Sequence, residues 1–330
     1  MPTSPSNSID LPEPYATPSV PEQALPGAVP ALLPVRWRVP ALLFVATVAS
    51  ILVTSALDEE PFRLANGVPF TVSLLAILLT HELAHYVAAR AHRVNASLPL
   101  FIPMPLLSLA GTMGAVIVMR DRIKSRNALL DIGASGPIGG MIVAIPVLLY
   151  GLAHSEVRPV TMTGWQEGQS LLYWLLKRIV LGPIPDGHDV FIGPVAEAGW
   201  VGLLVTMLNL LPVGQLDGGH VAYALFGPRQ NRYSKYFRFF LLGMAVVNVG
   251  VHLWPAFHSG LTEQIELMAT TSASLWFGWF VVLSVLDRFS DVGHPPTEPG
   301  ELSPARRVVA IATLVLFVLL FMPTPFMSYS

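Results

Sequence analysis

The stretch VPFTVSLLAILLTHELAHYVAA, residues 68–89, decides how this chain is interpreted. As a helix it is long enough to cross the hydrocarbon core of a bilayer, and its one formal charge is Glu82, inside the pentapeptide His81-Glu82-Leu83-Ala84-His85. Residues four apart on a helix lie about 40° apart around its axis, so both imidazoles can reach one metal ion with Glu82 beside it. Ionisable groups at membrane depth are costly and usually functional. The stretch therefore predicts a metal site within a membrane-spanning helix.

The composition of the whole chain agrees with a membrane protein. Of its 330 residues, 53% are hydrophobic and only 12% are charged, whereas a soluble domain has roughly 25% charged residues. Apolar runs close to the roughly 20 residues that a spanning helix needs lie at 40–57, 68–89, 128–153, 194–212, 239–256, 268–287 and 306–322. We therefore expect an all-α polytopic membrane protein with about seven transmembrane helices.

The basic residues divide unequally between the two sides that this model defines. One side has 15 of the 19: Arg36, Arg38, Arg90, Arg93, Arg120, Arg122, Lys124, Arg126, Arg229, Arg232, Lys235, Arg238, Arg288, Arg306 and Arg307. By the positive-inside rule this side is cytoplasmic. We expect a multi-pass protein of the cell membrane, with a cytoplasmic N-terminus and with the 154–193 loop and the C-terminus outside.

The spans divide the chain into three parts. Residues 1–39 are rich in Pro, which predicts a disordered cytoplasmic tail. We expect residues 40–322 to form one membrane-embedded domain and residues 323–330 to form a short C-terminal tail. Within the domain, three prolines interrupt any helix near 95–120, and the β-branched residues that follow favour a short re-entrant or β-hairpin segment. Irregular backbone at membrane depth must be buried in protein or line a wet cavity.

A third metal ligand is available downstream. The chain has no cysteine, so a protein-bound metal would take histidine and carboxylate ligands. An open catalytic zinc site has three protein ligands, and Asp217 is the one carboxylate in NLLPVGQLDGGH, residues 209–220. Its Pro and Gly residues can bend the chain so that Asp217 points back towards His81 and His85. A helix cap or a turn residue is the alternative for Asp217.

Three motifs together resemble the site-2 protease family of intramembrane zinc metalloproteases. They are His81-Glu82-Leu83-Ala84-His85, the small-residue segment 133–140, and residues 209–219, in the order in which the family has them. The resemblance implies that His81, His85 and Asp217 bind Zn²⁺, that Glu82 is the general base, and that Asn209 assists the binding of substrate or oxyanion. It also implies a membrane-embedded metalloprotease domain at 40–322 that acts in the lipid bilayer on transmembrane protein substrates, with no nucleic-acid partner.

Physical chemistry gives these roles a reason. Zinc lowers the pKa of bound water to about 7, Glu82 can accept the proton, and the Asn209 amide can donate to the developing oxyanion. An exposed strand edge near Gly111, Thr112 and Gly114 could hold an unwound substrate segment by β-augmentation. The segment 133–140 serves either close helix packing or substrate contact.

Two other functions fit some of these residues. Buried ionisable groups also line the paths of ion transporters and channels, although such proteins more often show inverted repeats, which this chain lacks. An inactive metal-bearing scaffold would have the same ligands. Zinc retention and substrate cleavage, measured together, separate the three.

Overall fold

The computed structural model describes residues 34–57, 62–106, 108, 110–160, 165–254, 263–289, 297–298 and 300–328. Nearly all of the tail expected at 1–39 lies outside these ranges. The described residues belong to one unit, Leu33–Ser330, and most of them are helical.

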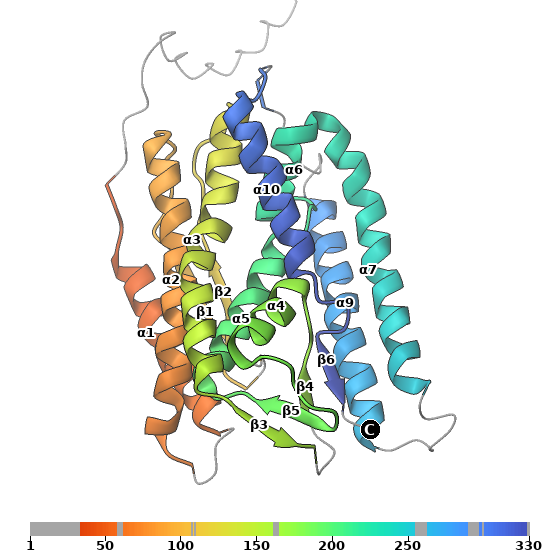
Figure 1. The fold of residues 1–330 in the computed structure, drawn as a ribbon. Coiled ribbons are helices and arrows are strands. Elements are labelled where there is room, and N and C mark those ends of the chain that lie inside the picture. The colour runs from red at the N-terminus through yellow and green to blue at the C-terminus, as the bar shows by residue number, and fades with distance from the viewer. Residues whose placement is uncertain are drawn as a thin grey trace, which may run out of the picture. The chain divides into compact units, whose positions relative to one another are not determined.

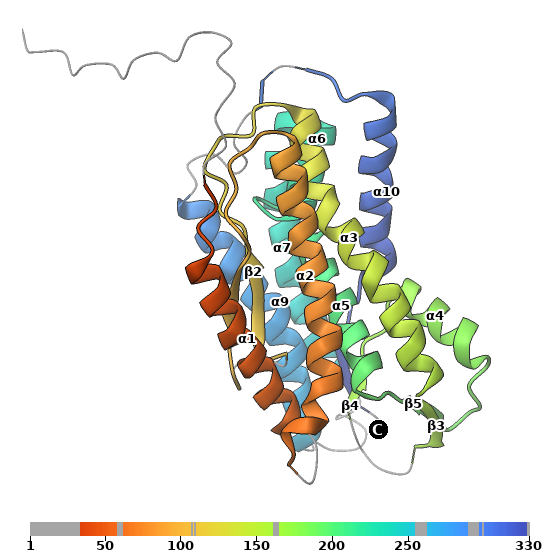
Figure 2. The same ribbon diagram turned by 90° about the vertical axis from the view of Figure 1, so that its left-hand side faces the viewer.

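A helix lies at each of the seven segments predicted to span the membrane. These are α1 (Arg38–Leu57), α2 (Val68–Ala91), α3 (Arg126–Ala153), α5 (Pro194–Asn209), α7 (Gln230–Leu253), α9 (Glu263–Phe289) and α10 (Pro304–Leu320). They run in alternating directions (Figures 1 and 2). Among the described residues there are also two shorter helices, α4 (Leu171–Leu181) and α6 (Asp217–Phe226), and the 3₁₀ turns η1 (Leu64–Gly67) and η2 (Gly227–Arg229).

Five helical segments in the described part of the chain are long and apolar enough to cross a membrane. They are Arg38–Leu57, Leu64–Ala91, Arg126–Ala153, Asp217–Leu253 and Thr270–Arg288. Helices α5 and α10, with 16 and 17 residues, are shorter than a full span. A membrane protein made mostly of helices is therefore confirmed, and the count of seven spans stays a prediction.

The fold is not purely helical, because the described residues also form three two-stranded sheets. Strand β1 (Leu100–Pro103) pairs antiparallel with β2 (Thr112–Val116), so the segment near 95–120 contains a β-hairpin. The hairpin lies against α1, where the Ser50 hydroxyl donates to the Gly111 carbonyl at 2.5 Å. Gly111 has φ +68°, and a Cβ there would lie 2.8 Å from Cα of Ile51, so this contact requires glycine. The depth of the hairpin in a membrane stays a prediction.

The loop expected at 154–193 has secondary structure of its own. Strand β3 (Glu156–Pro159) pairs with β5 (His188–Phe191), and β4 (Trp165–Glu167) pairs with β6 (Phe326–Ser328), which belongs to the segment expected as a C-terminal tail. These pairs lie at the end of the bundle where α3 ends (Figure 1). On α4, the buried Lys177 ammonium lies 2.8 Å from Oε1 of Glu167, which compensates both charges.

The core forms where α2, α3 and α5 pack together. Small residues bring these helices close: a Cβ on Gly199 of α5 would lie 2.8 Å from Cβ of Leu148 on α3, and one on Gly202 would lie 2.9 Å from Cδ1 of Ile77 on α2. Helix α6 packs against α3, whereas α7 and α9 pack chiefly against each other. The central three helices and α6 carry all the metal-binding and catalytic residues predicted from the sequence.

Candidate metal centre

His81, His85 and Asp217 come together between α2 and the start of α6. Nε2 of His81 and Nε2 of His85 each lie 3.2 Å from Oδ2 of Asp217, and the two nitrogens lie 3.2 Å from each other. The side chains are largely enclosed: His81 is 4% exposed and His85 6%. Three candidate ligand atoms from segments far apart in sequence therefore converge on one point.

The chain reaches this point by reversing after α5. Residues between Asn209 and Asp217 form an irregular turn, with φ +53° at Gly214, and Asp217 is the first residue of α6. A Cβ on Gly218 would lie 1.9 Å from the carbonyl oxygen of Leu210, and one on Gly219 would lie 2.3 Å from that of Gly214. Because only glycine fits so close to these carbonyls, the turn folds tightly and directs Asp217 towards α2.

Helix α3 packs directly against the side chains of the two histidines. A Cβ on Gly136 would lie 2.0 Å from Nε2 of His85, and one on Gly140 would lie 3.2 Å from Nδ1 of His81. One turn away, a Cβ on Gly139 would lie 2.7 Å from Cβ of Ala84. Of the two interpretations of segment 133–140, close helix packing is therefore the one observed.

The tautomer of His85 follows from its partner on α3. Nδ1 of His85 lies 2.7 Å from the carbonyl oxygen of Ile132, and because a carbonyl only accepts, Nδ1 must carry the proton. In the neutral imidazole, Nε2 then presents a lone pair to Asp217 Oδ2 and to His81. Lone pairs that face one another at this distance repel unless a proton or a cation lies between them, and a metal ion at this point would satisfy all three atoms at once.

The distances fit zinc. Ligand atoms about 2.0 to 2.1 Å from a tetrahedral zinc lie roughly 3.3 Å from one another. All three edges of the triangle formed by the two Nε2 atoms and Oδ2 are 3.2 Å. Two imidazoles and one carboxylate are a donor set that zinc prefers, and three protein ligands leave a fourth position for water. Among the described residues this is the one group of three or more such side chains close enough to hold a metal.

Glu82 and Asn209 lie beside this group. Glu82 adjoins His81 on α2 and is 8% exposed. Its carboxylate has no hydrogen bond or salt bridge with the residues that the structure describes, so it is not committed to a structural partner. Asn209, the last residue of α5, places Nδ2 3.4 Å from Nε2 of His81. Both polar groups therefore lie next to the three candidate ligands.

Two contributions to the site have no direct sequence signal. The orienting carbonyl of Ile132 belongs to the backbone, which no side-chain motif reveals. The Arg126 guanidinium, at the start of α3, donates to the carbonyls of Ala224 at 2.6 Å and Leu225 at 3.2 Å, at the end of α6. Its basic charge was predicted only to mark the cytoplasmic side.

Comparison with known proteins gives an independent result. The model of peptidase family M50 matches residues 69–249. The chain is 27% identical over 269 residues to "Probable zinc metalloprotease EGY2, chloroplastic" of Oryza sativa subsp. indica, covering 80% of this chain and 44% of that protein. It is 35% identical over 169 residues to "Probable zinc metalloprotease EGY1, chloroplastic" of Arabidopsis thaliana, covering 49% of this chain and 30% of that protein.

The chain thus spans less than half the length of these relatives. No solved structure matches it at a significant level.

Proposed function

The chain belongs to peptidase family M50, and from this premise we propose that it is an intramembrane zinc endopeptidase that hydrolyses peptide bonds of membrane-spanning proteins. The observation that carries the proposal is the triangle of His81, His85 and Asp217, with edges of 3.2 Å, built partly on a helix able to span a membrane. The names of the relatives, which describe zinc metalloproteases, support the choice of metal.

In this proposal His81, His85 and Asp217 hold the zinc ion. When bound, zinc supplies a Lewis acid that polarises the scissile carbonyl and lowers the pKa of water to about 7. Glu82 accepts the proton of the attacking water and delivers it to the leaving amine, so the general base of the first step is the general acid of the second. The Asn209 amide donates to the carbonyl oxygen as that oxygen gains negative charge.

The β-hairpin supplies a means of holding the substrate. A spanning helix hides its amides in internal hydrogen bonds, so cleavage requires a locally unwound segment. Strand β2 pairs with β1 on one side, and no other described strand pairs with it. A Cβ on Gly114, which has φ +93°, would have no atom within 4 Å, so there is open space beside this residue, and its N–H donates locally to Oγ1 of Thr112 at 3.1 Å. Of the edge residues predicted from the sequence, Gly111 and Thr112 are buried, so we assign substrate binding by β-augmentation to the edge of β2 at Gly114.

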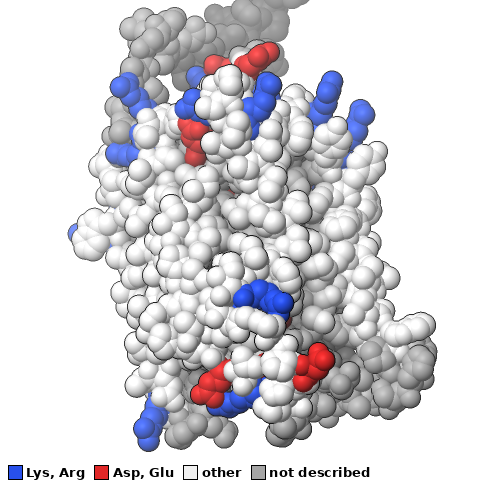
Figure 3. All heavy atoms as spheres, in the orientation of Figure 1, with Lys and Arg blue, Asp and Glu red and all other residues white. Residues whose placement is uncertain are grey.

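The proposed orientation follows from charge. Lys and Arg gather at the end of the bundle where α2 ends and α3 begins (Figure 3). If α5 and α10 also span the membrane, the positive-inside rule makes this end of the bundle cytoplasmic. The N-terminus of the chain is then also cytoplasmic, and the chain is a multi-pass protein of the cell membrane. The metal ligands lie towards the same end, so products released there would enter the cytoplasm, as in regulated proteolysis of a membrane-anchored protein.

The test compares the wild type with Glu82→Gln in lipid vesicles, with a panel of single-span substrates. We expect both proteins to bind one zinc ion, and the variant to lose cleavage by a factor of at least about 10². Leu83→Ala, at the neighbouring exposed position, is the matched control and should cleave normally. Removal of zinc with a chelator should abolish wild-type cleavage, and added zinc should restore it.

Each outcome of this test bears on one of the three functions. Zinc retained without cleavage by the wild type would contradict the protease and favour an inactive scaffold. Cation flux into sealed vesicles that depends on His81 and Asp217, without cleavage, would favour a transporter. Cleavage by Glu82→Gln at the wild-type rate would remove the proposed base from the mechanism.

A further inference from the structure

A second site lies along α10, apart from the metal centre. Two open cavities, of about 680 and 630 Å³, share Val318 in their linings. The first is lined by Gln169, Ser170, Leu171, Trp174, Phe237, Phe240, Phe317, Val318, Phe321 and Pro323. The second is lined by Leu225, Phe226, Arg307, Ile311, Leu314, Val315 and Val318. Because Val318 lines both and each lies beside α10, we treat the two cavities as one groove, which we call the α10 groove.

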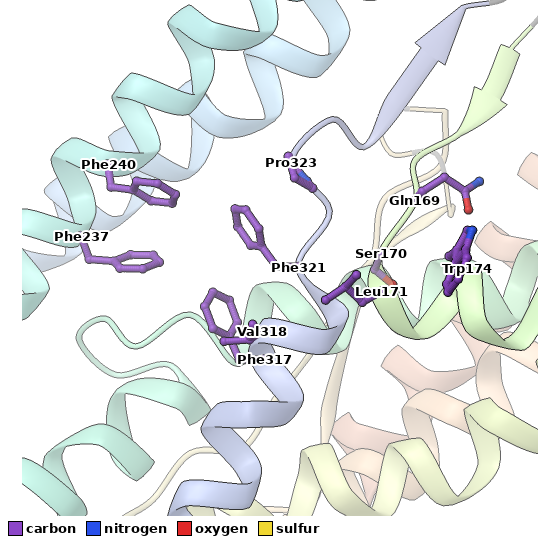
Figure 4. Close-up of a pocket in the computed structure, with 10 residues that line it drawn as sticks. All are labelled: Gln169, Ser170, Leu171, Trp174, Phe237, Phe240, Phe317, Val318, Phe321 and Pro323. Atoms are coloured by element: carbon purple, nitrogen blue, oxygen red, sulfur yellow. The ribbon is translucent and has the colours of Figure 1, made fainter.

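Four phenylalanine rings, from α7 and from the end of α10, line one end of this groove. Phe237 and Phe240 on α7 contact Phe317 and Phe321 in a closed circuit, with ring centroids 5.2 to 6.0 Å apart. Figure 4 shows the α7 and α10 rings facing the same space, with Leu171 and Trp174 of α4 across it. The lining is almost wholly apolar, which suits a hydrocarbon chain and does not suit an ion or a polar metabolite.

The groove has the length of a lipid chain. Arg307, Ile311, Leu314 and Val318 are spaced as one stripe of a helix. At 1.5 Å per residue, Arg307 and Val318 are about 17 Å apart along the axis, close to half of the roughly 30 Å hydrocarbon core. A chain that starts at Arg307 would therefore cross one leaflet and end at the four phenylalanine rings.

The charge of Arg307 indicates which chemical group could bind at the start of the α10 groove. The neighbouring Arg306 is already paired: its guanidinium forms a bidentate contact with Asp131, at 2.9 and 2.7 Å. Arg307 is exposed, and its guanidinium has no acidic partner in the described part of the chain. An unpaired guanidinium at the mouth of an apolar groove matches the phosphate of a lipid head group.

We propose that the α10 groove binds an anionic glycerophospholipid, with its phosphate at Arg307 and an acyl chain along Ile311, Leu314 and Val318 towards the phenylalanine rings. A transmembrane substrate helix fits less well. A spanning helix about 10 Å wide and 30 Å long occupies roughly 2,400 Å³, several times the volume of either cavity. The bound lipid would join α10 to α7.

The experiment measures lipid retention by the purified full chain. The protein is loaded with phosphatidylglycerol or phosphatidylcholine and washed in detergent, and bound lipid is counted by native mass spectrometry. We expect the wild type to retain phosphatidylglycerol about fivefold better, the factor typical of one cation near an anionic head group. Arg307→Gln should remove this preference, and Val318→Trp, which fills the groove, should reduce retention of both lipids.

Matched controls separate the groove from general effects. Arg232→Gln removes another exposed cation, on α7, and Val308→Trp adds the same bulk at an exposed α10 position outside both linings. Neither should change retention. Equal retention of the two lipids by the wild type, or equal effects of Arg232→Gln and Arg307→Gln, would overturn the proposal. So would a photo-crosslinker at Leu314 that captures a substrate helix in place of lipid.

Discussion

Nδ1 of His85 on α2 donates a hydrogen bond to the carbonyl of Ile132 on α3, 2.7 Å away. This contact fixes both the tautomer and the ring orientation of a proposed ligand, the role that outer partners of metal-bound histidines commonly have. The same helix holds α6 through Arg126. Helix α3 therefore positions ligands from both segments of the site while supplying none itself.

The glycine behind His85 gives the first prediction. Gly136→Ala would place a Cβ 2.0 Å from Nε2 of His85, which must move the imidazole away from Asp217, so we expect zinc binding to be lost. Gly140→Ala, with its nearest atoms of His81 at 3.2 Å, should have a smaller effect. Gly243→Ala in α7, where a Cβ would meet nothing within 4 Å, is the control. Zinc per protein, measured by elemental analysis, should follow this order; full zinc in Gly136→Ala would contradict the packing described here.

Asn209 gives the second prediction. If its amide stabilises the oxyanion, Asn209→Ala should retain zinc and lose about 10² to 10³ in kcat, the cost of one oxyanion donor in other enzymes. The amide also lies 3.4 Å from Nε2 of His81, so a purely structural role would instead show as weaker zinc binding. Zinc content and kcat, measured on the same sample, separate the two roles. A variant with normal kcat and normal zinc content would exclude both.

Arg126 gives the third prediction. Its guanidinium satisfies carbonyls at the end of α6, and leaving such groups unpaired costs about 1 to 3 kcal/mol. Because α6 begins with Asp217, Arg126→Ala should weaken zinc binding as well as stability. Arg122→Ala, which removes an exposed cation four residues earlier, should do neither. Zinc affinity by competition with a chelating dye is the measurement, and equal affinities of the two variants would remove Arg126 from the site.

The sequence predicted the parts of this site that local pattern determines. His81 and His85 share a helix face because four residues make about one turn, and the Pro and Gly residues around Asp217 predict the bend that returns it to the bundle. Each apolar run predicted as a span lies on a helix. Apolar character alone did not distinguish α5 and α10, which are shorter than a full span, from the longer helices.

The missing parts depend on segments that are distant in the chain. Strand β4 pairs with β6, more than 150 residues later, and neither short strand has a strong alternation of its own. The orienting carbonyl of Ile132 and the cap that Arg126 provides to α6 arise only after α2, α3 and α6 pack. Contacts of this kind follow from tertiary packing, so no motif in one segment could predict them.

The ion pair between Asp131 and Arg306 gives the last prediction, because it ties α10 to α3 beside Ile132. The Asp131 carboxylate accepts from Nη2 of Arg306 at 2.7 Å and from Nε2 of His92 at 2.8 Å. All three side chains are partly exposed, so the pair should be worth about 1 kcal/mol. In a double-mutant cycle, Asp131→Ala and Arg306→Ala should each lower Tm by a few degrees, and the double variant should lose little more than either one. Arg232→Ala, which removes an exposed cation on α7, should leave Tm unchanged. Strictly additive losses would show that the two residues stabilise the protein independently, and α10 would then be held to α3 by apolar packing alone.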